Sequence, residues 1–166
     1  KVKNIKALAR KTAYDLWMMD QRGCLSPMVL YAQKGGEVSP LELGRLVAAE
    51  LRLLVHRENG VKDKNFLSAA AQMVRENSRS VRQASFVREF RELKDVYRAL
   101  RPFKSRLQAV ALEAKPGLRE KIAEELSRLG VNRICRAGQM QRPPLLWHHD
   151  GRPNLATLVR WTDLES

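Results

Sequence analysis

The sequence predicts a three-layer α/β fold in which helices flank a small, mostly parallel sheet. Three observations support it: an amphipathic helical pattern near the start, a clear helix start in the middle, and a strand–helix–strand pattern toward the end. Strands joined through a helix run parallel and are typical of α/β proteins. A chain of 166 residues is long enough for a core of its own, so we expect residues 1–166 to form a single domain.

The first predicted helix covers residues 2–19, where apolar residues recur at steps of three and four. Gly23 stands just beyond it, where a glycine commonly ends a helix. The apolar run at 28–32 follows a proline and precedes two glycines, which predicts a buried strand.

The second predicted helix has the strongest local signal in the chain. Ser39 can cap it, Pro40 fits its first position, and Glu42 can close a capping box. Its apolar stripe should end near His56. Residues 61–80 then begin polar and become helical in pattern.

The middle of the chain gives weaker signals. Residues 81–87 fit either a strand or a continued helix. A short helix is predicted over 93–100, because its apolar residues keep helical spacing and Pro102 stops it.

A strand–helix–strand unit follows. Residues 106–112 predict a strand, residues 116–117 a turn, and the apolar stripe over 118–129 a helix that Gly130 ends. Residues 131–135 predict the second strand. The two strands should pair in parallel.

The remaining chain is a long irregular segment over 136–154, and loops of that length in compact domains are usually functional. Asn154 is of the right type to cap a last helix over 155–159.

The balance of charge favours an anionic partner. The chain carries 31 basic and 18 acidic residues, a formal net charge of +13. Nucleic acid, an acidic protein and coenzyme A all fit that charge. The densest basic patch is interrupted by glutamates and is typical of a solvated helix face; it comprises Arg75, Arg79, Arg82, Arg88 and Arg91.

Other features bear on location. Two cysteines are too few for a disulfide framework, so we expect a reduced, cytoplasmic setting. No apolar run reaches the length of a membrane span, and the basic start leads into no signal-peptide core.

The stretch from Met19 to Pro27 holds the first candidate site. It places Cys24 on a turn marked by Gly23, with short backbone around the thiol and room for a substrate. A covalent nucleophile needs that arrangement. The alternative is that Cys24 is a small buried hydrophobe, as most isolated cysteines are.

The second candidate site is His148-His149-Asp150, since histidine is the usual acid or base near neutral pH. Here the alternative is that Trp147 packs and that Asp150 and Gly151 form a turn. No metal site is expected, because the cysteines and histidines lack ligand spacing. Neither a phosphate-cradling glycine loop nor a serine nucleophile elbow is present.

Two separated stretches resemble one family. Residues 20–27, Asp-Gln-Arg-Gly-Cys-Leu-Ser-Pro, resemble the catalytic-cysteine segment of the bacterial long-chain acyl-CoA reductases, the reductase component of the bioluminescence fatty-acid reductase complex. The tail, from 130–134 through Trp-His-His-Asp-Gly-Arg-Pro at 147–153 to 158–161, is similar to the end of the same proteins. Residues 107–110 also fit.

The resemblance implies the catalytic half of an aldehyde dehydrogenase-like fold, without the dinucleotide-binding part. Cys24 would attack a long-chain acyl thioester, and NADPH would reduce the S-acyl enzyme to a fatty aldehyde. Gln21, Arg22 and Gly23 would lie at the substrate, and His148 or His149 would transfer protons. Implied partners are fatty acyl-CoA or an acylated protein, the acyl-protein synthetase and transferase subunits, and further copies of the chain.

Two other readings remain open. The chain could be a basic module that binds nucleic acid or an acidic protein, although no helix-turn-helix, zinc-finger or RNA-binding signature supports nucleic acid as a partner. It could also be an inactive remnant of the reductase fold with a structural role. In the enzyme reading, Cys24 should sit at a sheet edge, beside an unusually apolar exposed face.

Overall fold

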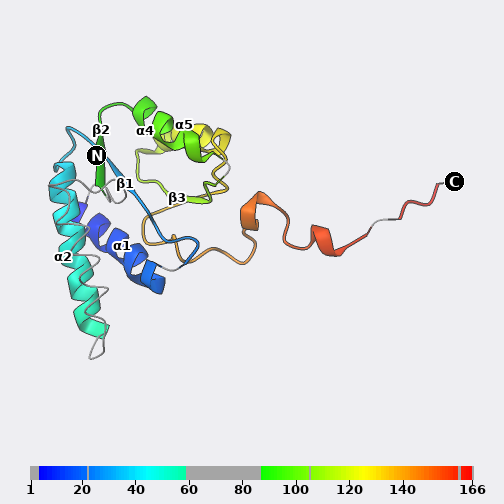
Figure 1. The fold of residues 1–166 in the computed structure, drawn as a ribbon, viewed down its shortest axis with the longest axis horizontal. Helices are drawn as coiled ribbons and strands as arrows, with labels where there is room; N and C mark the ends of the chain where they lie inside the picture. The colour runs from blue at the N-terminus through cyan, green and yellow to red at the C-terminus, as the bar shows by residue number, and fades with distance from the viewer. Residues whose placement is uncertain (1–3, 22, 59–86, 105, 161, 166) are drawn as a thin grey trace.

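The computed structural model describes residues 4–21, 23–58, 87–104, 106–160 and 162–165. Two groups of helices and short strands form the body of the molecule, and a C-terminal segment runs away from both (Figure 1). The first group contains α1 and α2, and the second contains α4 and α5.

The first helix, α1 (Ile5–Trp17), confirms the prediction from helical spacing. The Asn4 side chain caps its start and accepts the backbone N–H of Ala7 at 2.9 Å. The helix therefore begins one turn before its first buried residue, Ala9. A 3₁₀ turn over Met18–Gln21 follows and brings the chain to Gly23.

The first strand, β1 (Leu30–Gln33), begins two residues later than predicted. The predicted strand is also less buried than expected: Met28 is 75% exposed and Val29 is 41% exposed. Both residues precede the first pair between β1 and its neighbour, in which Leu30 lies opposite Val87.

The second helix, α2 (Pro40–Glu58), has the predicted start. Ser39 Oγ accepts the amide of Glu42 at 3.1 Å, which satisfies one of the free N–H groups at the helix end. The helix reaches two residues beyond the expected end at His56.

The strand β2 (Val87–Phe90) lies parallel to β1, with Leu30 opposite Val87 and Gln33 opposite Phe90. Val87 therefore belongs to a strand, whereas residues 61–80 and 81–86 of the earlier predictions lie outside the described residues. α2 packs closely on β2, since a Cβ at Gly44 would stand 3.1 Å from Val87. The first core lies between α1, α2 and β1 and contains Ala9, Ala13, Leu16, Ala32, Leu43, Val47 and Leu51.

The second group confirms the predicted strand–helix–strand unit. It begins with α4 (Leu93–Leu100) and continues through β3 (Ala109–Ala111), α5 (Pro116–Arg128) and β4 (Arg133–Cys135). β3 and β4 are parallel, with Val110 opposite Ile134.

The bounds of this unit differ from the prediction. Both strands are shorter than the predicted 106–112 and 131–135. The residues predicted to form a turn, 116–117, are the first two residues of α5. Proline is favoured at a first helical position, because its missing N–H would have no partner there.

Gly130 ends α5 as predicted and is required there. Its φ is +93°, and a Cβ at this position would stand 2.3 Å from the carbonyl oxygen of Lys104. The second core lies beside this turn and consists of Ile122, Leu126 and Val131, with Leu93, Tyr97, Leu100, Leu107, Val110 and Ile134 packed against them.

The predicted single sheet is not what the described strands form. They make two separate two-stranded parallel sheets, β1–β2 and β3–β4. Each sheet packs on its own helices and has its own core, so the described part of the chain is a mixed α/β structure with two strand pairs.

The predicted last helix over 155–159 is wrong. Only a 3₁₀ turn over Ala156–Leu158 forms there. Asn154 does not cap it: its amide group donates to the carbonyl of Trp147 at 2.9 Å and accepts the amide of His149 at 3.2 Å. Within the described residues, no helix is long and apolar enough to cross a membrane.

Candidate active site around Cys24

Cys24 lies on a tight turn between the 3₁₀ turn after α1 and the start of β1. The amide of Ser26 donates to the carbonyl of Gly23 at 2.9 Å and closes the turn. Leu25 and Ser26 are buried, at 6% and 8% exposure, whereas Cys24 itself is exposed. The residues after the cysteine therefore anchor the turn and leave the thiol facing outward.

Gln141 holds this turn from the far end of the chain. Its side-chain Nε2 donates to Ser26 Oγ at 2.9 Å. On the other side of the turn, a Cβ at Gly23 would stand 3.1 Å from Gln141 Oε1, 3.3 Å from Met19 Cβ and 3.3 Å from Ser26 Oγ. Gly23 is therefore needed for close packing rather than for its backbone conformation. It is not one of the described glycines with a positive φ.

Asp15 fixes the loop that carries Gln141. Its carboxylate on α1 accepts the amide of Gly138 at 2.6 Å and that of Met140 at 3.0 Å. Asp15 is only 1% exposed. Burial raises the pKa of this carboxyl above 3.8, and the two backbone hydrogen bonds and the charge of Arg133 partly offset the rise.

Arg133 binds the same loop from β4. Its guanidinium donates to the carbonyls of Gln139 at 2.6 Å, Met140 at 2.7 Å and Arg142 at 3.3 Å. One buried cation and one buried anion therefore hold the backbone of residues 136–142, one through its carbonyls and the other through its amides.

A further contact joins the end of this loop to α1. Arg142 donates to the hydroxyl of Tyr14 at 2.5 Å and lies 5.0 Å from the centre of its ring. The loop thus connects the two strand pairs of the body, because α1 belongs to the first group and β4 to the second.

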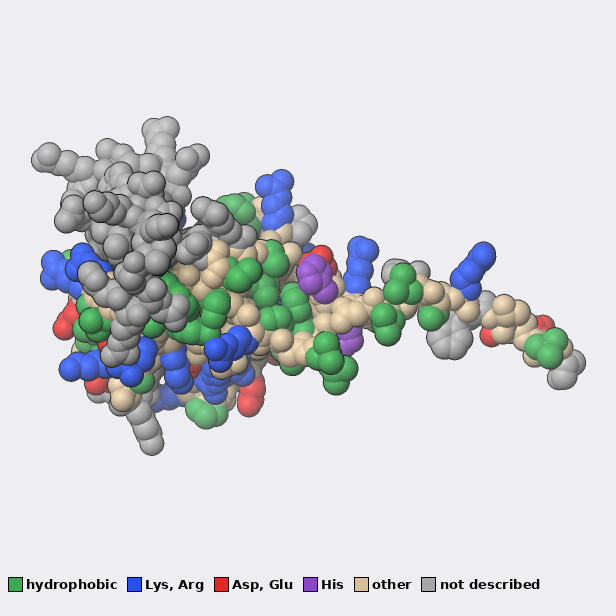
Figure 2. Space-filling view, turned by 90° about the horizontal axis from the view of Figure 1, so that it is seen from below, with side chains coloured by type: hydrophobic (Ala, Val, Ile, Leu, Met, Phe, Trp, Pro, Cys, Tyr) green, Lys and Arg blue, Asp and Glu red, His purple; other side chains and the backbone are tan. Residues whose placement is uncertain are grey.

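The second candidate site is a turn at the root of the C-terminal segment, where Figure 2 shows exposed histidine side chains. His149 Nδ1 lies 3.2 Å from Asp150 Oδ2, and Gln108 donates to Asp150 Oδ1 at 3.0 Å. The ring of Trp147 stands 5.0 Å from that of His149. Trp147 therefore packs, and Asp150 lies in a turn, as the alternative reading of this stretch predicted.

Backbone strain marks both candidate sites. Among the described non-glycine residues, only Met19 and Asp150 have positive φ, at 64° and 54°. Met19 precedes Cys24 by five residues, and Asp150 follows the two histidines. Such a conformation costs about 1–3 kcal/mol and is concentrated at functional sites.

The predicted site residues lie in two separate turns. Gly23 and Cys24 share one turn, and His148 and His149 share another, but no hydrogen bond between described residues joins the two turns. Gln21 lies in the 3₁₀ turn before Cys24. Arg22 and the side chain of Gln21 lie outside the described part of the chain.

The sequence patterns did not indicate Asp15, Arg133 or Gln141. Their contacts in this site are to backbone groups or to a hydroxyl, so no motif spacing marks them. The only signal is a charged residue, Asp15, beside the apolar positions of α1.

The other cysteine differs from Cys24. Cys135 is partly buried on β4, with its sulfur 3.6 Å from that of Met140. Burial raises the pKa of its thiol above the ordinary 9.0, and the charge of Arg133 works in the opposite direction. Across the part of the chain that is described, no three cysteine, histidine or acidic side chains gather as metal ligands.

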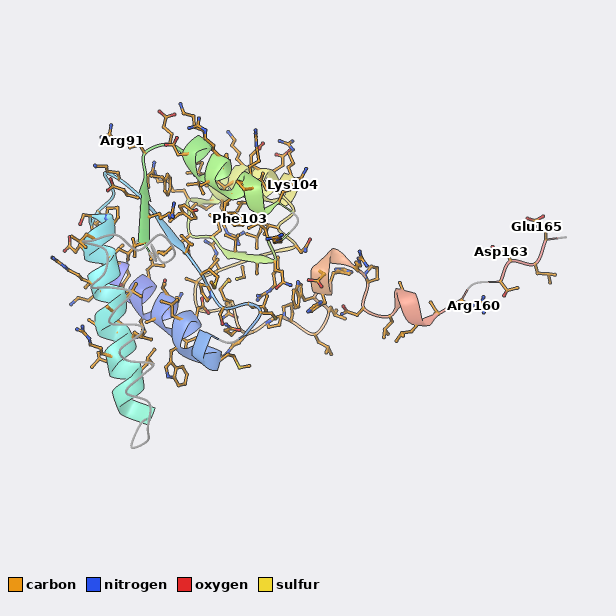
Figure 3. The ribbon with its side chains drawn as sticks, in the orientation of Figure 1. Arg91, Phe103, Lys104, Arg160, Asp163 and Glu165 are labelled. Atoms are coloured by element: carbon orange, nitrogen blue, oxygen red, sulfur yellow. The ribbon has the colours of Figure 1, made fainter. Side chains whose placement is uncertain are left out.

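The basic surface is interrupted by carboxylates. Lys94 pairs with Glu92 at 2.6 Å, and Arg128 of α5 pairs with Glu124 at 2.5 Å and with Glu125. Figure 3 shows Arg91 and Lys104 on either side of α4, and Arg160, Asp163 and Glu165 along the C-terminal segment. Three arginines of the patch noted in the sequence, Arg75, Arg79 and Arg82, lie outside the described residues.

Fold and site together define an α/β protein that presents one accessible thiol on a turn held by buried polar groups. The family model for acyl-CoA reductase (LuxC) matches residues 1–78 and 67–161, and the chain belongs to this family. The match confirms the resemblance seen in the sequence. No curated protein and no solved structure matches the chain.

Proposed function

We propose that this chain carries the acyl-transfer step of a long-chain acyl-CoA reductase, with Cys24 as the nucleophile. The observation that carries the proposal is the turn itself: Cys24 is exposed while Leu25 and Ser26 are buried and Gln141 holds the turn. Family membership supplies the class of reaction.

In the proposed step, the thiolate of Cys24 attacks the carbonyl carbon of the acyl thioester. A new carbon–sulfur bond forms to Cys24, and the carbonyl oxygen becomes an oxyanion. The intermediate then breaks its bond to the sulfur of coenzyme A, which leaves and takes up a proton. The backbone N–H of Cys24 makes no hydrogen bond to another described residue, and we propose that it donates to the oxyanion.

Exposed apolar side chains on both sides of Cys24 suit an acyl chain. Met19 is 61% exposed and Met28 is 75% exposed, and Val29 follows them at 41%. Burial of a bound chain against such side chains contributes about 0.8 kcal/mol per methylene group. Methionine adapts its shape to an apolar ligand, which favours a chain rather than a rigid substrate.

We assign proton transfer to the histidine turn. Asp150 faces Nδ1 of His149, which leaves Nε2 of that ring available to give a proton to the departing thiolate. Gln108 holds the other oxygen of the Asp150 carboxylate. Among the described residues, the His148 side chain makes no hydrogen bond, ion pair or ring contact, whereas Asp150 and Trp147 orient the ring of His149, so we assign the role to His149.

NADPH is the reductant we expect, but the described residues do not fit a dinucleotide site. Gly35 and Gly36 follow β1, but no further glycine follows them before α2 begins at Pro40, so the spacing of a phosphate-binding glycine loop is missing. Ser39 already occupies the amide of Glu42 at the start of α2. We therefore propose that residues 1–166 form a single catalytic part and that the dinucleotide is held by residues other than the described ones.

The same proposal names the partners and the setting. The acyl group arrives on coenzyme A or on an acylated protein, such as a synthetase or transferase subunit, and the reaction takes place in the cytoplasm. Copies of the chain associate with one another. An inactive remnant of the fold is the competing reading, and it predicts no acyl transfer.

Release of coenzyme A tests the proposal. Without a reductant, the chain should release one equivalent of coenzyme A from a long-chain acyl-CoA and then stop, because Cys24 stays acylated. Chromatography of the free coenzyme A measures this burst. Cys24→Ala should release none, and Cys135→Ala should match the unmodified chain. Equal release by Cys24→Ala, or no burst from the well-folded chain, would refute the proposal.

A further inference from the structure

Three polar contacts form one connected path to the Cys24 turn. Asp15 binds the backbone of Gly138 and Met140, the next residue is Gln141, and the Gln141 amide binds Ser26. The path closes a ring, because Asp15 lies on α1, the helix that leads into Cys24. A ring of this kind restrains the turn from both of its ends.

The Gln141 side chain reaches both sides of the cysteine. Its Nε2 holds Ser26, two residues after Cys24, and its Oε1 lies against Gly23, one residue before. Among the described residues, Gln141 makes its side-chain hydrogen bond to Ser26 and none to Cys24. Its effect on Cys24 is therefore exerted through the turn.

The loop that carries Gln141 is held by two buried charged residues. Asp15 and Arg133 are 1% and 8% exposed, and together they bind five backbone groups of residues 138–142. Hydrogen bonds to buried charged groups are stronger than those between neutral groups. Gln141 is thus presented from a loop whose backbone is fixed on both sides.

The hydrogen bond from Gln141 is important because Ser26 is buried. Ser26 is 8% exposed, and the loss of the Gln141 side chain would leave its hydroxyl without this hydrogen-bond partner. The turn could then satisfy Ser26 only by moving it toward water, and Cys24 would move with it.

We propose that Gln141 is a positioning residue for the acyl-transfer step, which holds the Cys24 turn in the orientation that accepts the thioester. The inference rests on the proposed function of Cys24. It adds a residue that lies 117 positions beyond the cysteine and acts through Ser26. Even a small displacement of the Cys24 sulfur lowers the rate of acyl transfer, because the attack depends on the alignment of the sulfur with the thioester carbonyl.

The experiment compares Gln141→Ala with Gln139→Ala, a matched control because Gln139 is exposed and its side chain makes no hydrogen bond to a described residue. The first readout is hydrogen exchange of the Ser26 amide, which is bonded to Gly23. Gln141→Ala should speed this exchange and leave α5 unchanged, and Gln139→Ala should exchange like the unmodified chain.

The second readout is the rate of single-turnover acylation by a long-chain acyl-CoA. In Gln141→Ala the maximal rate should fall about tenfold, the equivalent of one lost hydrogen bond of about 1.4 kcal/mol. The concentration for half-maximal rate should stay unchanged. Gln141→Glu should recover part of the rate, because the Ser26 hydroxyl can donate to a carboxylate.

Ser26→Ala provides a second variant that approaches the same bond from the other side. It should lower the acylation rate as Gln141→Ala does, and the double variant should lose little more. Unchanged exchange at Ser26, or faster exchange with an unchanged acylation rate, would overturn the inference. If the unmodified chain takes up no acyl group while Gln141→Ala still speeds exchange, the proposed function fails and the hold on the turn stands.

Discussion

The carboxylate of Asp15 accepts the backbone amide of Met140 at 3.0 Å, across a separation of 125 residues. This bond joins α1, which leads into Cys24, to the loop that follows β4. The same carboxylate binds Gly138 at 2.6 Å. Because it is buried, the pair of bonds ties together two groups of strands that share no sheet.

Replacing Asp15 with asparagine should destabilise the chain. An asparagine can accept only one of the two amides and turns its own N–H₂ toward the other, so one buried N–H loses its acceptor. Such a loss costs about 1–3 kcal/mol. Urea unfolding measures it, with Asp163→Asn on the exposed C-terminal segment as the control. An unchanged midpoint in Asp15→Asn would show that the two bonds do not support the fold.

The stability gap between the unmodified chain and Asp15→Asn should depend on pH. Because burial raises the folded-state pKa of Asp15 above 3.8, the folded chain binds this proton more readily than the unfolded chain. The contribution of Asp15 to stability is therefore greatest below pH 3.8 and declines as the pH rises through the folded pKa. Urea unfolding of both chains from pH 4 to 7.5 should show that the stability gap narrows as the pH rises. A gap that widens with rising pH would contradict a raised pKa of Asp15.

Two glycine substitutions should separate backbone strain from collision. Gly35 and Gly130 both have positive φ, at 79° and 93°, but only at Gly130 would a Cβ meet a backbone oxygen, at 2.3 Å. Gly35→Ala should cost about 1 kcal/mol for the left-handed conformation. Gly130→Ala should cost about 1–3 kcal/mol more, because the turn must also shift. Thermal unfolding compares them, and equal losses would rule out the close approach to Lys104.

The two cysteines should react with iodoacetamide at different rates. Cys24 is exposed, whereas Cys135 is partly buried and its thiol has a pKa raised above 9.0 by burial. Since the thiolate is the reactive form, Cys135 should be modified slowly near pH 8 and faster as the pH rises. Peptide mapping after brief exposure should find the label at Cys24 first. Faster labelling of Cys135 would contradict the burial of its side chain.

Local patterns were sufficient for most helices and strands. Helical spacing indicated α1, a Ser39 cap indicated the start of α2, and the glycine at 130 indicated the end of α5. These features depend on neighbours within a few residues. The predicted strands also formed, but which strands share a sheet depends on packing between segments far apart, and the expectation of one sheet was wrong.

The residues that hold the candidate site could not be found in that way. Helical spacing in α1 marks the face that packs on α2, whereas Asp15 lies on another face that the loop at 136–142 covers. Asn154 was misassigned for a related reason. It is a residue of the capping type, but its side-chain amide binds the backbone of Trp147 and His149, which precede it in the sequence.

The intact mass of the chain after incubation with a long-chain acyl-CoA tests the central claim most directly. Our account predicts one added acyl group on the unmodified chain and on Cys135→Ala, removable by neutral hydroxylamine as a thioester should be. It predicts no added mass on Cys24→Ala. An acyl group that remains on Cys24→Ala, or its absence from the folded unmodified chain, would contradict the assignment of Cys24 as the nucleophile.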